Sequence, residues 1–268
     1  MLSQAELAPV KMRPGGNGKG PSADPIRGAV VAREVLAIGP EEQARFRALR
    51  RTPVLAGLGD PEVLALAKAA RRRELKRRQA LFFAGDPADQ VYIILDGALK
   101  VSRVSADGHE VTLTIIGPGE LCGELALIEP GLRATVAEAL QDAQVLGIPV
   151  AEFNRAMRGS PDLAARVAHR IAQRLREVEE LVEDLASREV PARLARLLLR
   201  LAEQYGAPSN GAVALALPLA HQDLAHCIGS TRETTTITLN TFRRLGLIEM
   251  APCRIIIKNL HGLCAHTS

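Results

Sequence analysis

The period of the hydrophobic and polar positions changes twice along the chain. In DPEVLALAKAA (residues 60–70) apolar positions recur at helical spacing. From 81 to 148 apolar and polar positions alternate in short runs, which Asp-Gly and Gly-Pro-Gly sequences separate. From Pro161 onward helical spacing returns. This order predicts helices, then a sandwich or barrel of short strands, then helices again.

The segment before the strands divides into parts of different composition. Residues 1–28 are rich in Pro, Gly and Lys and predict a disordered tail, whereas 29–51 predict one or two short helices. Asp60, followed by a proline, is the expected N-cap of the helix at 60–70. The basic run at 71–78 is interpreted as a solvated face leading into a strand, and contact with nucleic acid is the alternative.

One long helix is predicted from 161 to 188, with Ser160 as its cap and Pro161 at its first position. Its apolar positions are spaced alternately four and three residues apart, and charged residues surround them. A narrow seam of this kind is typical of a helix that pairs with a second copy; packing on its own domain is the alternative. The predicted dimer seam consists of Ile171, Leu175, Val178, Val182 and Leu185.

Pro191 is expected to end this helix, with a second helix at 192–205 and a loop at 206–211. The following residues, 221–242, predict a helix-turn-helix. Such a motif needs a small residue where the helices touch and a residue that tolerates a left-handed conformation in the turn, and Ala225 and Gly229 meet these needs. The shared core is expected to contain Leu224, Ile228 and Leu239.

The second helix of this motif carries residue types that read DNA. Arg232 can donate two hydrogen bonds to a guanine, and Glu233 can accept one from a cytosine. Threonine hydroxyls suit phosphates, and 247–257 predict a two-stranded wing on which Arg254 could reach the DNA backbone. The predicted DNA-binding set is His221, Thr231, Arg232, Glu233, Thr234, Thr236, Ile237 and Arg254.

Composition narrows the class of protein. The chain has 268 residues, a formal net charge of +4, 47% hydrophobic and 24% charged residues, and its basic excess lies after residue 191. No apolar run approaches the roughly 20 residues that span a bilayer, and no signal peptide precedes the helices, so a cytoplasmic protein is expected. We find no nucleophile–base pair, no CxxC pair among the four cysteines and no phosphate-binding glycine loop. Neither an enzyme, a metal site nor a resident cofactor is expected.

Three stretches resemble the CRP/FNR family of bacterial transcription regulators. They are GELCGELALIEPGLRATV (119–136), PDLAARVAHRIAQRL (161–175) and LAHQDLAHCIGSTRETTTITLNTFRRLGLIE (219–249). The resemblance implies an α+β fold made of a cyclic-nucleotide-binding-type jelly-roll β-barrel (52–158), a long dimerisation helix (159–190) and a C-terminal winged helix-turn-helix (191–268). It also implies that Thr231 and Thr234 meet phosphates, and that Ile237 replaces a second base-reading arginine.

The resemblance further implies an effector pocket. Members that bind cyclic AMP hold it with a Gly-Glu pair, here Gly123 and Glu124, and with an Arg-Ser pair before Ala-Thr-Val. Anchoring on Ala134 puts Leu132 in the place of that arginine and Arg133 in the place of that serine. The loop is also short by about one residue, and Arg133 could take the phosphate role if the loop adjusts. On the long helix, Val178 and Glu179 replace the adjacent Thr and Ser that hold the adenine. Cyclic AMP is therefore not the expected effector. The possibilities that remain are another ligand, a cyclic dinucleotide, a protein partner, or no ligand at all.

The sequence thus predicts a homodimer that binds a near-palindromic site on double-stranded DNA and reorients its DNA-binding domains about a hinge near 189–191. RNA polymerase would be a further partner of an activator. The alternative is a ligand-sensing regulatory module that acts through a protein partner and has weakened DNA binding.

Overall fold

The computed structural model describes residues 38–209, 211–251 and 254–267. The predicted tail at 1–28 and the first part of the predicted helical extension, 29–37, lie outside these ranges. The rest of the extension forms helix α2 (Pro40–Arg50), which is followed by the short helix η1 (Pro53–Leu55) and by α3 (Asp60–Ala69).

The predicted cap of α3 is wrong by one residue. Gly59 is the N-cap, and Asp60 is already the first helical residue. The carboxylate of Asp60 lies 2.6 Å from a guanidinium nitrogen of Arg50 on α2. An acidic residue in the first turn also suits the positive end of the helix dipole, so Asp60 stabilises the helix start without capping it.

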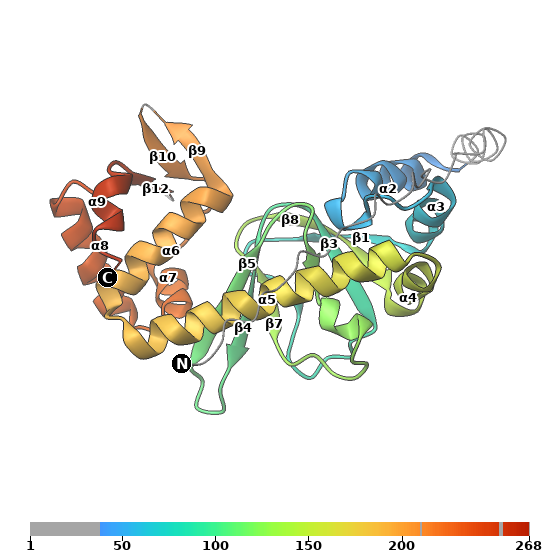
Figure 1. The fold of residues 1–268 in the computed structure, drawn as a ribbon, viewed down its shortest axis with the longest axis horizontal. Helices are drawn as coiled ribbons and strands as arrows, with labels where there is room; N and C mark the ends of the chain where they lie inside the picture. The colour runs from blue at the N-terminus through green and yellow to red at the C-terminus, as the bar shows by residue number, and fades with distance from the viewer. Residues whose placement is uncertain (1–37, 210, 252–253, 268) are drawn as a thin grey trace, which may run out of the picture. The chain divides into compact units, whose positions relative to one another are not determined.

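Two four-stranded antiparallel sheets form the barrel that the alternating pattern predicts (Figure 1). Their strand orders are β1-β8-β3-β6 and β2-β7-β4-β5, and the crossing connections between them are those of a jelly roll. The strands are β1 (Arg71–Leu75), β2 (Ala80–Phe82), β3 (Gln90–Asp96), β4 (Leu99–Val104), β5 (Glu110–Ile116), β6 (Leu121–Cys122), β7 (Val136–Ala139) and β8 (Ala143–Pro149). A short helix η2 (Glu124–Leu127) lies between β6 and β7.

The barrel core follows from the alternation along these strands. Ile94, Leu99, Ile116 and Val145 are fully buried and pack together inside it. The first five residues of the basic run form the edge strand β1, and four of these five are exposed, which agrees with the expected solvated face.

Helix α4 (Val150–Gly159) leads into the long helix α5 (Pro161–Ser187), which runs along the barrel to the C-terminal domain (Figure 1). Ser160 caps α5 as predicted, because its side chain accepts a hydrogen bond from the backbone N–H of Leu163. The proline-break prediction is wrong in detail. Pro191 lies in the first turn of α6 (Val190–Tyr205), where its missing N–H costs no hydrogen bond.

A third four-stranded sheet, ordered β11-β12-β10-β9, organises the C-terminal domain. The predicted loop at 206–211 is largely strand β9 (Gly206–Ser209), which pairs with β10 (Ala212–Leu215). The predicted wing is β11 (Ile248–Ala251) and β12 (Arg254–Ile257), and β12 also pairs with β10. Helices α7 (His221–Cys227), α8 (Arg232–Arg244) and α9 (Leu260–Cys264) complete the domain.

Within the described ranges, no helix has the length and apolarity to cross a bilayer, and no cluster of three potential metal ligands occurs. Cys122 and Cys227 are buried, and Cys264 is exposed. Burial raises the pKa of the Cys227 thiol to about 12 and that of Cys122 still further above its usual range, so both stay protonated and behave as small apolar side chains.

Candidate DNA interface and sensor pocket

Helices α7 and α8 form the predicted helix-turn-helix. The turn between them contains Gly229 with φ of 55°, a left-handed conformation that favours glycine. A Cβ at this position would also lie 2.5 Å from Cδ2 of Leu185 at the end of α5, a side-chain end that can move aside, so the left-handed backbone is the reason for glycine here. The predicted shared core is confirmed, since Leu224, Ile228 and Leu239 are all at most 2% exposed.

The start of α8 is held by its threonines. Thr231 is the N-cap, and its hydroxyl accepts a hydrogen bond from the N–H of Thr234 at 3.2 Å. Thr235 and Thr238 are buried and donate their hydroxyls to carbonyls of the preceding turn. Thr236 donates in the same way to the carbonyl of Arg232 at 2.8 Å. In the free protein these threonine hydroxyls therefore hydrogen-bond to the backbone of the helix itself.

An exposed edge remains on α8 for a ligand. It presents Arg232, Glu233, Thr234 and Ile237, and the Ile237 side chain is 66% exposed although it is large and apolar. Arg232 and Glu233 form no ion pair with any residue that the structure describes. Their charged groups are free to contact bases.

His221 and Arg254 lie at the borders of this edge. Nδ1 of His221 lies 2.8 Å from the hydroxyl of Thr236, which ties the first residue of α7 to α8. Burial, together with the charge of Arg232, lowers the pKa of His221 below its usual 6.5. Arg254 is exposed at the first position of β12.

The barrel contains a cavity of about 370 Å³ at the predicted effector position. Six of the seven predicted residues line it: Gly123, Glu124, Leu132, Arg133, Ala134 and Val178. The seventh, Glu179, does not line the cavity, and its side chain is exposed.

Arg133 is the unusual member of this lining. Its side chain is 7% exposed, donates to the carbonyls of Gly123 and Gln90, and places its guanidinium carbon 4.4 Å from the ring centre of Phe82. Its Nε has no hydrogen-bond partner, and no carboxylate of the described residues lies within 4 Å of it. A buried cation without a counter-charge is unfavourable, so this site favours an anion.

The sequence interpretation missed Arg174, which lines the same cavity from α5. Its Nε lies 3.8 Å from Oε1 of Glu124, a carboxylate that is 7% exposed. A signal was present, because Arg174 precedes Val178 by four residues and must share its helix face. Thr114 on β5 also lines the cavity and carried no signal of its own.

The predicted dimer seam lies along α5. Leu175 and Val182 are 58% and 59% exposed, and Leu185 is 37% exposed. Ile171 and Val178 are half-buried, and Leu185 also contacts the turn at Gly229. A stripe of exposed apolar side chains therefore follows one face of this helix.

Comparisons with known proteins match both domains. Residues 72–160 match the family model of the cyclic nucleotide-binding domain, and residues 192–266 match that of the Crp-like helix-turn-helix domain. A global nitrogen regulator of Synechococcus elongatus is 34% identical over 188 residues, which cover 69% of this chain and 85% of that protein.

Two further similarities extend this result. A CRP-like cAMP-activated global transcriptional regulator of Mycobacterium tuberculosis is 29% identical over 80% of this chain and 96% of that protein. The solved structure of a CRP-family transcriptional regulator from Thermus thermophilus aligns with a TM-score of 0.63 at 30% identity, covering 73% of this chain and 96% of the other. The chain belongs to the CRP/FNR family of bacterial DNA-binding transcription regulators.

Proposed function

We propose that the protein acts as a homodimer on a near-palindromic DNA site, with the start of α8 from each protomer in successive major grooves. The exposed edge of Arg232, Glu233 and Ile237 carries this proposal, because it combines a bidentate donor, an acceptor and an apolar side chain on one rigid helix. The functional parts are the sensor (52–158), the dimer helix (159–190) and the DNA-binding domain (191–268).

The dimer follows from the exposed stripe on α5. Leu175 and Val182 are large apolar side chains that water surrounds in a single chain, and their spacing suits pairing of two helices. Two copies of α5 would then hold the two DNA-binding domains at a fixed separation. Half-sites should lie about one helical turn apart, roughly 10 base pairs.

We further propose that the sensor takes a small anion other than cyclic AMP. A volume of about 370 Å³ is within the range of small-molecule sites. Arg133 supplies a buried positive charge, whereas Leu132, in the place of the arginine of cyclic-AMP-binding members, is 70% exposed. The cAMP-activated relative from Mycobacterium tuberculosis provides the contrast against which this part is tested.

Selection of bound duplexes from random DNA tests the DNA-binding proposal. The selected sites should be inverted repeats, and Arg232→Ala should lose roughly 1–3 kcal/mol of discrimination at one guanine–cytosine pair. Arg155→Ala is the control, since it removes an exposed arginine of the sensor that pairs with Glu152. An Arg232→Ala protein that selects the wild-type site would refute this role of Arg232.

Two outcomes would redirect the proposal. If cyclic AMP tightens binding of the selected duplex by about tenfold or more, a coupling within the normal allosteric range, the exclusion of cyclic AMP is wrong. If the protein selects no duplex, the alternative of a sensor that acts through a protein partner gains support.

A further inference from the structure

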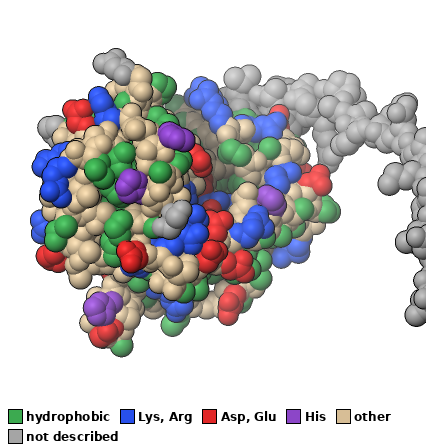
Figure 2. All heavy atoms as spheres, turned by 60° about the vertical axis from the view of Figure 1, so that its left-hand side comes forward, with side chains coloured by type: hydrophobic (Ala, Val, Ile, Leu, Met, Phe, Trp, Pro, Cys, Tyr) green, Lys and Arg blue, Asp and Glu red, His purple; other side chains and the backbone are tan. Residues whose placement is uncertain are grey.

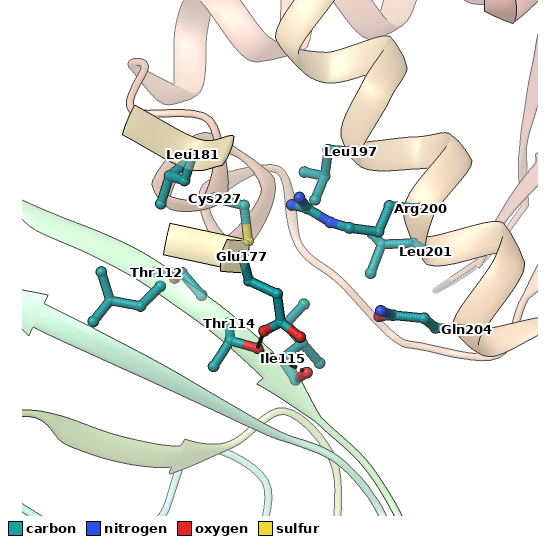
Figure 3. A pocket seen from close by; sticks show the side chains of 11 residues that line it. Thr112, Thr114, Ile115, Glu177, Leu181, Leu197, Arg200, Leu201, Gln204 and Cys227 are labelled. Atoms are coloured by element: carbon teal, nitrogen blue, oxygen red, sulfur yellow. Dashed lines mark hydrogen bonds between the residues drawn. The ribbon is translucent and has the colours of Figure 1, made fainter. Parts of the chain in front are cut away.

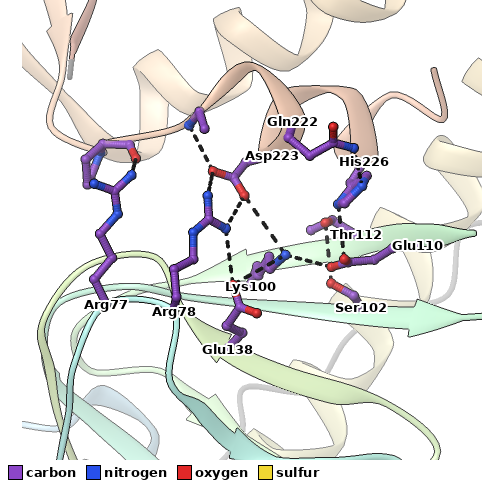
Figure 4. A network of polar contacts seen from close by, with 12 residues as sticks. Arg77, Arg78, Lys100, Ser102, Glu110, Thr112, Glu138, Gln222, Asp223 and His226 are labelled. Atoms are coloured by element: carbon purple, nitrogen blue, oxygen red, sulfur yellow. Dashed lines mark hydrogen bonds and ion pairs between the residues drawn. The ribbon is translucent and has the colours of Figure 1, made fainter. Parts of the chain in front are cut away.

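The first helix of the DNA-binding motif is joined to the sensor barrel by a network of charged groups (Figure 4). Arg78, between β1 and β2, donates two hydrogen bonds to the carboxylate of Asp223 on α7, at 2.7 and 2.9 Å. Asp223 is 2% exposed, and the backbone of Arg78 has a left-handed φ of 69°. Bidentate pairs of this kind are the strongest type of charged hydrogen bond.

Lys100 on β4 lies beneath this pair and is 4% exposed. Its Nζ lies 2.7 Å from Glu110, 3.6 Å from Glu138 and 4.0 Å from Asp223. Arg78 also contacts Glu138 at 3.1 Å. Two cations thus hold three carboxylates that come from both the barrel and the DNA-binding domain.

Two further contacts lie on either side of this pair. Near the C-terminal end of α7, Nδ1 of His226 lies 3.2 Å from Glu110; before its first residue, Arg77 donates to the carbonyl of Pro218 at 3.2 Å (Figure 4). We call the set Arg78, Lys100, Glu110, Glu138, Asp223 and His226 the latch.

Side chains beside the latch also join the two domains. Cys227 of α7 and Leu181 of α5 line a small cavity of about 30 Å³ between β5, α5, α6 and α7 (Figure 3). Ala98 and Leu140 of the barrel belong to the same hydrophobic cluster as the core of the DNA-binding domain. Tyr205 on α6 donates its hydroxyl to the carbonyl of Ile115 at 3.2 Å. The two domains therefore form a packed interface, which we call the joint.

In this joint the sensor lies beside the DNA-reading edge. The β4–β5 hairpin residues 108–110 and residues 231–233 at the start of α8 line one hollow of about 310 Å³. Phosphates border the major groove on both sides, so a duplex that receives Arg232 would meet this hairpin. The hairpin carries the exposed carboxylate of Asp107, which repels phosphate.

We propose that the latch is an autoinhibitory contact that holds α7 and α8 on the sensor in an arrangement that DNA cannot enter. This rests on the proposed function as a DNA-binding regulator. DNA binding then requires the Arg78–Asp223 pair to separate, and the free energy of the latch is subtracted from the affinity for DNA.

The effector cavity and the latch lie on opposite faces of the same strand pair. Val101 of β4 lines the cavity, while its neighbours Lys100 and Ser102 face the latch, as the alternation of a strand requires. A bulge pairs Val101 with Thr114 and Ser102 with Thr112, so it brings both Leu113 and Thr114 to the cavity. A ligand that moves this strand pair would therefore displace Lys100 and Glu110.

The test is Arg78→Gln in the full chain without added ligand, with the duplex recovered by random selection as the probe. The variant should bind this duplex roughly 5- to 150-fold more tightly than the wild type, the range of ordinary allosteric coupling. Lys76→Gln is the matched control: it removes the same charge from the same basic run, but Lys76 pairs with Asp142 within the barrel. Arg78→Lys should restore part of the inhibition.

Hydrogen exchange without DNA gives a second reading. Amides of α7 and of β5 should exchange faster in Arg78→Gln than in the wild type, which supports separation of the joint. Unchanged exchange, or faster exchange with unchanged or weaker DNA affinity, overturns the autoinhibitory role. If neither wild type nor variant binds any duplex while exchange still rises, the DNA-binding proposal has failed, and autoinhibition of it falls with it.

Discussion

At the scale of single residues, His221 shows how a hydrogen bond can set a protonation state. The hydroxyl of Thr236 donates its proton to the carbonyl of Arg232, so it can only accept from Nδ1 of His221. In the neutral ring Nε2 then has a lone pair and cannot donate to a phosphate. The protonated ring can donate from both nitrogens.

This argument predicts that DNA binding takes up a proton at His221. Burial and Arg232 lower its pKa below 6.5 in the free protein, and a phosphate at Nε2 would raise it. Affinity should therefore increase as the pH falls from 8 through the region below 6.5, by at most about tenfold per pH unit for one proton. Fluorescence anisotropy of a labelled duplex measures this slope. His221→Gln should flatten the slope, whereas His169→Gln, which changes an exposed histidine on α5, should not. A slope that survives His221→Gln contradicts the assignment.

At the scale of elements, local patterns predicted more than distant ones. The helix-turn-helix was predictable because Gly229, Leu224 and Leu239 stand at fixed short spacings in one segment. Strand β9 was not, since Gly206 and Pro208 resemble loop residues and only pairing with β10 makes them a strand. The Arg78–Asp223 pair joins residues 145 apart in sequence, and no spacing rule could connect them.

Charged residues in place of the apolar residues of the seam on α5 should separate the dimer into monomers. Leu175→Glu with Val182→Glu replaces the two most exposed apolar residues of the seam by charges that repel across the pair, while glutamate preserves helix propensity. Sedimentation equilibrium should show monomers, with unchanged circular dichroism. Affinity for a full inverted repeat should fall about 100-fold or more, because the second half-site no longer binds intramolecularly. Arg176→Glu, on the charged face of the same helix, should remain dimeric; a dimeric double variant would disprove the seam.

At the scale of the whole molecule, surface charge does not identify a partner. On the face drawn in Figure 2, Lys and Arg side chains stand among Asp and Glu side chains, in keeping with a net charge of only +4. The distinctive charges lie inside: Asp223 and Lys100 in the latch, and Arg133 in the sensor cavity. Buried charges cost solvation free energy unless something compensates them, and only the first two have ion-pair partners in the described part of the chain.

Arg133 should therefore make the stability of the molecule depend on small anions. Inorganic phosphate, a small dicarboxylate and cyclic AMP are the probes, added to the wild type and to Arg133→Met during thermal unfolding. An anion that fills the cavity at 100 times its Kd stabilises the wild type by about 2.7 kcal/mol, whereas Arg133→Met should respond to none of the probes. Arg155→Met, which changes an exposed arginine, should respond like the wild type. The assignment fails if Arg133→Met responds like the wild type or if no anion stabilises either protein. If cyclic AMP gives the largest increase in unfolding temperature, the pocket accepts this nucleotide despite Leu132.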